Sequence, residues 1–317
     1  MAGDRLAERA ALVHWLLDAD PAIRWQVMRD LLDEPEPIVA RERSRVAHEG
    51  WGARLLDLQA PSGHWGGAAF VPKAWVSTFD TLQLLFELGL DPESERARAA
   101  IRRVREHCDW DHWHGYSPFF QGEVEPCING RVLAIGAYFG AANHRLLERL
   151  LGEQLADGGW NCQAPPSQVS SFHSTICVLE GLLEYERVNG AQPEITAARR
   201  RAHEYLLERR LFRRRSTGEV VREEWTQFRF PVRWRYDVLR ALDYLRRAGV
   251  GPEPRLSEAL ELVARRRDGS GRWLLEAPHP GQPHFHLEEA VGEPSRWITL
   301  RALRVLDWFD ASRGARG

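Results

Sequence analysis

A short unit recurs along this chain: a proline, an Arg-Trp pair and then leucines at helical spacing. It is clearest at residues 230–245, and residues 72–88 carry a version with lysine in place of arginine. Full or eroded copies begin near residues 20, 72, 126, 173, 230 and 293. Six segments at intervals of roughly 45 to 65 residues predict an array of repeated supersecondary units.

The helices expected between these segments are of a different kind. In residues 143–155 leucines fall at i, i+3, i+4 and i+7 with charges opposite, which is typical of a helix with one solvated face. Residues 132–142 and 175–183 have almost no polar face, so they are expected to be buried on all sides. This alternation predicts an all-α fold, an (α/α)6 toroid of about six helical hairpins that forms one domain over residues 1–317. An open helical solenoid would alternate similarly and stays an alternative.

Bulk composition excludes several function classes. The 317 residues include 43 basic and 45 acidic side chains, which gives no electrostatic case for nucleic acid or for an anionic membrane. No run is long and apolar enough for a membrane span, and the first residues lack an apolar signal core. Four cysteines at irregular spacing are expected to be free thiols. The expected location is therefore the cytoplasm.

Two connectors carry a more specific motif. Residues 59–65 and 154–160 both read Gln-x-x-x-Gly-x-Trp, and eroded versions occur near residues 107–113, 214–220 and 267–273. The motif resembles the QW repeat of the terpenoid cyclases and squalene-hopene cyclases. That superfamily shares an α/α toroid with the protein prenyltransferase β subunits, so the resemblance implies the same fold. Glutamine, glycine and tryptophan are expected to be scaffold residues that hold the turn.

Candidate site residues follow from the expected geometry. In a ring of parallel inner helices all N-termini meet at one mouth, where free N–H groups and helix dipoles favour anions. The polar residues at these starts are Arg24, Lys73, Glu125, Cys127, Asn129, His173, Arg233, Arg235, Tyr236, Asp237 and Arg296. Basic groups outnumber carboxylates, which predicts a small anionic or amphipathic substrate, although arginines that cap the ring through ion pairs would give the same pattern.

Roles can be assigned within this set. Lys73, the only lysine of the chain, is expected with Glu125, His173 and Asp237 to be catalytic; Lys73 would help to neutralise a leaving group, and His173 or Glu125 would act as a general base. The aromatic side chains would line the throat, and His286, in a Pro/Gly-rich connector, would form a lid or proton shuttle. The residues expected to bind substrate are Arg24, Trp75, Asn129, Arg233, Arg235, Tyr236, His286, Arg296 and Trp297.

The resemblance also implies a metal. Prenyltransferases hold zinc with an Asp-x-Cys pair and a histidine, and this chain offers Glu125-Pro-Cys127 and His173, with Cys162 between them. Thiolate and imidazole ligands suit Zn²⁺. Cys127, Cys162 and His173 are therefore candidate zinc ligands, although buried thiols and a core histidine would look the same.

The function expected from these features is an enzyme of the cyclase or prenyltransferase-like class. It would bind a substrate that carries phosphate, diphosphate or sulfate and promote departure of that group, as a transferase, lyase or cyclase in an apolar barrel that excludes water. The Asp-x-Asp-Asp motif of squalene-hopene-type cyclases is absent from the inner segments, which disfavours cyclisation started by protonation. The alternative is a non-catalytic toroid that binds a ligand or a protein partner subunit.

Overall fold

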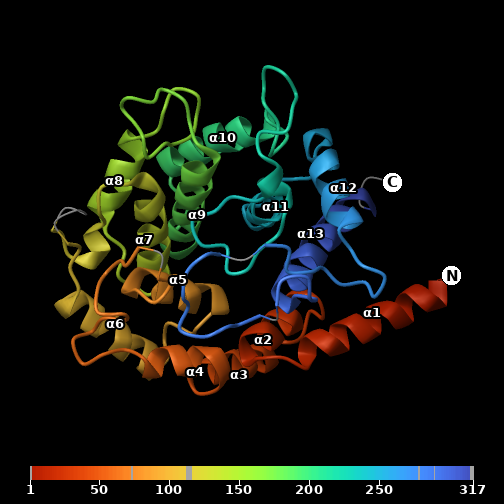
Figure 1. The fold of residues 1–317 in the computed structure, drawn as a ribbon, viewed down its shortest axis with the longest axis horizontal. Helices are drawn as coiled ribbons and strands as arrows, with labels where there is room; N and C mark the ends of the chain where they lie inside the picture. The colour runs from red at the N-terminus through yellow and green to blue at the C-terminus, as the bar shows by residue number, and fades with distance from the viewer. Residues whose placement is uncertain (1, 73, 112–115, 278, 289, 315–317) are drawn as a thin grey trace.

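The computed structural model describes all residues except 1, 73, 112–115, 278, 289 and 315–317. The described residues form thirteen α-helices and four short 3₁₀ helices arranged as a ring of two layers (Figure 1). The predicted all-α toroid is confirmed. No described helix is long and apolar enough to cross a membrane.

Six helices surround the centre of the ring and the others lie outside them (Figure 1). The inner helices are α2 (Pro21–Asp30), α5 (Thr78–Leu88), α7 (Pro126–Tyr138), α9 (Phe172–Asn189), α11 (Val238–Arg247) and α13 (Arg296–Gly314). The outer helices are α1 (Ala2–Leu17), α3 (Glu36–Ser44), α4 (Gly50–Asp57), α6 (Glu95–His107), α8 (His144–Gly152), α10 (Pro193–Leu207) and α12 (Ser257–Arg265).

The inner helices begin at strong capping residues. Side chains of Asp20, Ser77, Ser171, Asp237 and Ser295 accept hydrogen bonds from backbone N–H groups two or three residues on. Such caps satisfy amides that have no partner inside the helix. Helix α7 differs, because Glu125 at its start makes no capping bond with its side chain.

The QW-like motifs hold the outer layer together. Gln154 donates to the carbonyl oxygens of Gly158 (2.6 Å) and of Ala198 on the next outer helix (2.8 Å), and the Trp160 indole donates to Leu150 (2.7 Å). The first motif repeats this pattern: Gln59 donates to Gly63 and Ala100, and Trp65 to Leu55. Gly63 and Gly158 have φ of +82° and +98°, which glycine adopts without strain. The scaffold role expected for these residues therefore has a structural basis.

Two glycines bring α7 and α9 into close contact. A Cβ atom at Gly130 would lie 2.5 Å from the carbonyl oxygen of Cys177, and one at Gly181 would meet the carbonyl oxygen of Gly130. Only glycine permits the two backbones to approach so closely. Both helices are buried along most of their length, as their lack of a polar face predicts.

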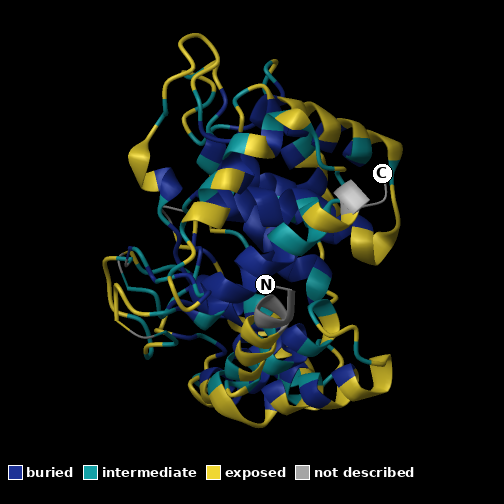
Figure 2. Cartoon of the chain, turned by 90° about the vertical axis from the view of Figure 1, so that its right-hand side faces the viewer, coloured by how far each residue is buried: buried dark blue, intermediate teal, exposed yellow. Residues whose placement is uncertain are grey.

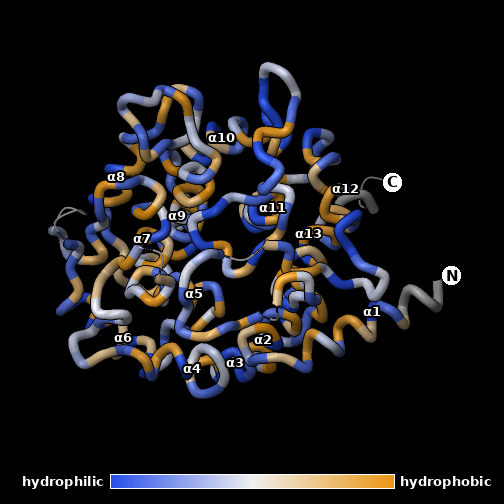
Figure 3. Tube along the Cα trace, in the orientation of Figure 1, coloured by the Kyte–Doolittle hydropathy of each residue, from blue (hydrophilic) through white to orange (hydrophobic). Residues whose placement is uncertain are grey.

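The ring is closed by contacts between its last and first helices. Arg9 on α1 forms a bidentate ion pair with Asp307 on α13, at 3.2 and 2.7 Å, and Arg304 on α13 binds Gln26 on α2 at 2.8 Å. These contacts exclude the open solenoid. Buried residues gather in the middle of the molecule (Figure 2), and Figure 3 shows that polar and apolar residues alternate along the helices of both layers.

Candidate functional site

Long connectors meet at the end of the ring where the inner helices begin. They run from outer to inner helices and comprise residues 58–77, 108–125, 153–171, 208–237 and 266–295. The last two cross the middle of the ring in Figure 1. They cover a cavity of about 130 Å³, called here the mouth cavity. Its lining includes Leu55, Trp75, Thr81, Leu84, Phe230, Arg233, His279, His284, His286 and Glu288.

A buried ion pair lies beside the mouth cavity. Arg233, in left-handed backbone conformation (φ +53°), places a guanidinium nitrogen 3.6 Å from Asp80 and lies 4.8 Å above the Trp75 ring. Asp80 also accepts a hydrogen bond from the Ser77 hydroxyl at 2.6 Å. Burial raises the pKa of Asp80 and lowers that of Arg233. The cation predicted at the mouth is therefore present, but a carboxylate already balances it.

Two histidines lie near this pair. The His284 Nε2 lies 2.9 Å from the Thr81 hydroxyl, and the tautomer of the ring decides which of the two atoms donates. His279 packs edge-on against Trp75. Burial and the Arg233 charge lower the pKa of both rings, that of His279 to about 3. Both histidines are therefore neutral at pH 7.

Glu288 is the acid–base candidate of the mouth. Its Oε1 accepts hydrogen bonds from the Ser295 hydroxyl (2.5 Å) and the Trp297 amide (3.1 Å) at the start of α13. Burial raises the pKa of Glu288 to about 7, although these bonds and the Arg296 charge oppose the rise. Both protonation states are thus populated near neutral pH, as general acid–base chemistry requires.

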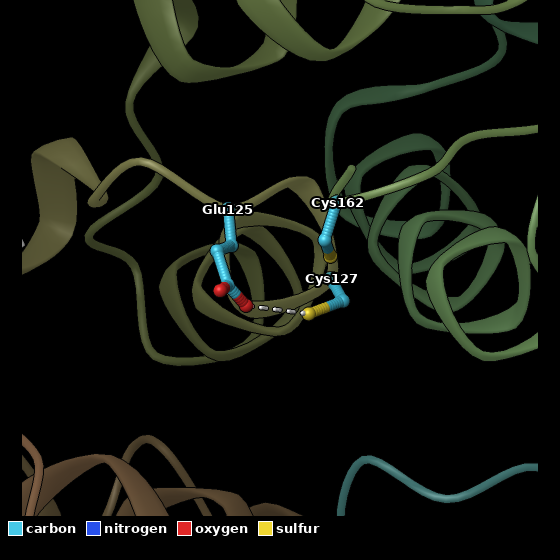
Figure 4. Close-up of side chains that lie close together, drawn as sticks. All are labelled: Glu125, Cys127 and Cys162. Atoms are coloured by element: carbon cyan, nitrogen blue, oxygen red, sulfur yellow. Dashed lines mark hydrogen bonds between the residues drawn. The ribbon is translucent and has the colours of Figure 1, made fainter. Parts of the chain in front are cut away.

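A second group of reactive side chains lies at the start of α7. Glu125, Cys127 and Cys162 place one donor atom each within 4.8 Å of one another, and the Cys127 Sγ lies 3.5 Å from Glu125 Oε2 (Figure 4). A hydrogen bond between the two thiols lowers the pKa of Cys162 and raises that of Cys127. Among the described residues this is the one group of three or more His, Cys, Asp or Glu side chains with metal-binding spacing.

The structure corrects the predicted zinc ligands at His173. The His173 Nδ1 accepts the Tyr236 amide at 2.8 Å, and the ring packs against Trp225 and Trp234. Burial lowers the pKa of His173 to about 4, with several arginines adding to the effect. The His173 imidazole therefore belongs to an aromatic cluster. Glu125, and not His173, lies beside the two cysteines.

Several other predicted site residues stabilise the ring instead. They form helix caps, connector bonds and contacts to the outer layer, and none of them lines the mouth cavity. Arg24 pairs with Glu42, Asn129 binds the Glu123 backbone, Tyr236 donates to Leu211, Asp237 caps α11, Arg235 stacks on Trp234, and Arg296 binds the Trp15 carbonyl. The structure therefore places these six predicted site residues away from the mouth cavity. Lys73 lies outside the described residues.

The middle of the ring corrects the expectation of an apolar barrel. A cavity of about 440 Å³, called here the lumen cavity, extends between the inner helices toward their C-terminal ends. Charged side chains of α2, α5, α9, α11 and α13 line it, so many charges of the inner helices face inward. Phe230 stacks on Trp297 with 4.4 Å between ring centroids. Phe230 lines both cavities, whereas Trp297, expected at the throat, lines only the lumen cavity.

Sequence reasoning found part of the mouth and missed the rest. Trp75, Arg233 and His286, which were predicted to bind substrate, line it. Asp80 and Glu288 were missed because a carboxylate in the first turn of a helix or in a connector is usually solvated, and His279 was missed because a histidine in a connector is usually solvated too. A usable signal was the run of histidines in the Pro/Gly-rich connector at residues 279–286.

The fold and its cavities define the class of this protein as a closed α/α toroid with a covered mouth and a charged lumen. No protein-family model and no curated protein matches the chain. The structure is similar to that of the type II terpene cyclase MstE from Scytonema, with 17% identity over 91% of this chain and 86% of that one and a TM-score of 0.46. A complex of MstE with merosterolic acid A gives 16% identity, 89% and 85% coverage and a TM-score of 0.45. A polysaccharide lyase gives 13% identity, 76% and 73% coverage and a TM-score of 0.39.

Proposed function

We propose that the protein is an enzyme that removes a proton from a small, largely apolar substrate in the mouth cavity, with Glu288 as the general base. The observation that carries this proposal is a carboxyl group with a pKa of about 7 that lines a covered cavity. A base works best when its pKa lies near the working pH, and such groups are concentrated at active sites. Proton removal would complete a cyclisation, an isomerisation or an elimination.

The rest of the mouth suits an uncharged reacting centre. Leu55, Leu84 and Phe230 supply apolar surface, and Trp75 and His286 supply rings. Arg233 is already paired with Asp80, so the mouth holds little uncompensated positive charge. The mouth cavity therefore favours proton transfer over departure of an anionic group. A lyase, cyclase or isomerase reaction fits it better than a transferase reaction.

The proposal is tested by replacing Glu288. Glutamine keeps the acceptor for Ser295 and Trp297 but cannot take a proton, so Glu288→Gln should retain the fold and lower kcat/KM about 10²- to 10⁴-fold. In the wild type, kcat/KM should rise with pH through about 7, because the ionised form is the base. Conversion is assayed on a panel of linear isoprenoid alcohols and their diphosphates, and mass spectrometry detects the products.

The matched control is Glu293→Gln in the same connector, at an exposed position, which should leave conversion unchanged. Infrared spectra between pH 5 and 9 should show one protonated carboxyl band that disappears near pH 7 and is missing in Glu288→Gln. If that band is absent from the wild type, or if Glu288→Gln converts substrate at the wild-type rate, Glu288 is only a cap of α13. A protein that converts no member of the panel would favour the non-catalytic binding module.

A zinc ion at the start of α7 is a second proposal, supported by the Glu125, Cys127 and Cys162 group. Zn–S and Zn–O bonds of roughly 2.3 and 2.1 Å in tetrahedral geometry place ligand atoms roughly 3.5 Å apart. The 3.5 Å between Cys127 Sγ and Glu125 Oε2 fits this geometry. Three protein ligands leave one position for water or substrate, where a bound metal would supply a Lewis acid.

Elemental analysis tests the zinc proposal. Protein purified with zinc supplied should contain one equivalent, and Cys127→Ser and Cys162→Ser should each lose it. His173→Ala should keep the metal, because the His173 Nδ1 is held by the Tyr236 amide. Zinc-free wild-type protein, or loss of zinc in His173→Ala alone, would contradict this ligand set.

A further inference from the structure

The lumen cavity carries more positive than negative charge. Seven arginines and five carboxylates line it within the described part of the chain. The arginines are Arg29, Arg187, Arg240, Arg246, Arg247, Arg301 and Arg304, and the carboxylates are Asp30, Glu87, Glu180, Glu184 and Asp243. The charge of this wall is thus positive by about two elementary charges when all of these groups are ionised.

The pairing pattern shows where the excess lies. Three carboxylates each lie between two guanidinium groups: Asp30 between Arg29 and Arg304, Asp243 between Arg246 (2.9 Å) and Arg301 (3.8 Å), and Glu184 between Arg247 (3.2 Å) and Arg187 (3.7 Å). Among the described residues Glu180 forms an ion pair with Arg240, and Glu87 forms one with Arg131, which does not line the cavity. Because two guanidinium groups share one carboxylate, each trio keeps one positive charge without a counterion.

Helix ends account for only part of this charge: Arg29, Arg187, Arg246 and Arg247 lie in the last turns of α2, α9 and α11, but Arg301 and Arg304 do not lie in a last turn. The C-terminal dipole of a helix favours cations only within its last turn. Arg301 and Arg304 lie in the middle of α13, which continues to Gly314. Arg304 is 7% exposed, and its Nε has no hydrogen-bond partner among the described residues. Burial, together with Arg246 and Arg29, lowers the pKa of Arg304 to about 10 although Asp30 and Asp243 oppose the shift.

Aromatic side chains form another part of the same wall. Trp25, Phe86, Tyr138, Phe230 and Trp297 line the cavity together with Val232. Its volume of about 440 Å³ lies within the range of small-molecule sites. A cavity with both a cationic and an aromatic surface suits a ligand that is charged at one end and apolar at the other.

We propose that the lumen cavity is a binding site for a small organic anion, with its phosphoryl or carboxylate group between Arg301, Arg304 and Arg246 and its apolar part against Phe230 and Trp297. A planar guanidinium group binds such oxyanions through two parallel hydrogen bonds. An anion there would supply the missing counterion. This site shares Phe230 with the mouth cavity but does not depend on the role of Glu288.

Calorimetric titration of the full chain at low salt tests the site with three probes: inorganic phosphate, phenyl phosphate and benzoate. Phenyl phosphate should bind tightest, because it fills both surfaces; benzoate tighter than phenyl phosphate would assign a carboxylate ligand. Arg301→Gln should weaken binding about 10- to 100-fold. Arg265→Gln, an equal charge change at an exposed position of α12, should leave it unchanged.

Two further measurements keep the proposal open to refutation if Arg301→Gln does not fold. Asp243→Asn removes a shared carboxylate, so it should bind phenyl phosphate more tightly than the wild type. In the wild type, phenyl phosphate should protect Arg301 and Arg304 from phenylglyoxal, as read by mass spectrometry, while sodium chloride of equal ionic strength should not. The proposal is overturned if no probe binds, if Arg265→Gln weakens binding as much as Arg301→Gln, or if the two arginines gain no protection.

Discussion

At the scale of single residues, one amide side chain joins three parts of the repeat. Gln154 follows the end of its own outer helix, contacts the turn at Gly158 and reaches Ala198 on the neighbouring outer helix, and Gln59 does the same two repeats earlier. A short polar side chain therefore fixes the distance between consecutive hairpins. Its two acceptors are backbone carbonyls, and each loses one donor if the amide is removed.

Gln154→Ala should lower the free energy of unfolding by about 1–3 kcal/mol, because two partly buried carbonyl groups lose a donor. Urea unfolding monitored by tryptophan fluorescence measures the change. Gln121→Ala, at an exposed position, should stay within about 0.5 kcal/mol of the wild type. Equal effects of the two substitutions would show that the motif does not hold the turn.

At the scale of elements, α7 and α9 form the closest helix pair of the inner layer described above. Gly181→Ala places a methyl group against the backbone of Gly130, which cannot move without shifting α7. The expected cost is about 2 kcal/mol or more. Gly152→Ala, at the end of α8 with open space around its Cβ position, should be neutral or stabilising by up to about 1 kcal/mol. Thermal unfolding of the two variants gives the comparison, and a Gly181→Ala protein as stable as the wild type would refute the close contact.

At the scale of the whole molecule, the repeat period and the QW-like motifs predicted the closed ring, because hydrophobic spacing and turn residues act locally. The same local signals could not predict that charged side chains of the inner helices face the lumen cavity. In α11 and α13 arginines alternate with leucines, and periodicity alone cannot tell a polar face toward solvent from one toward a central cavity. The raised pKa of Glu288 depends equally on burial, in a cavity that the distant residues 230–233 help to line. Such placement follows from tertiary contacts, and only the structure supplies it.

The contacts that join α13 to α1 and α2 make the ring a cycle of six similar steps. A cycle has no obligatory first step, so the seam between the last and first hairpins is structurally one junction among six. The short links between inner and outer helices, such as residues 139–143, face away from the mouth. Opening the backbone at one of them and joining the old ends would leave the mouth connectors and the lumen arginines intact. The order of hairpins along the chain is thus separable from their order in space. Circular permutation would change the order along the chain and keep the arrangement of the hairpins in the ring.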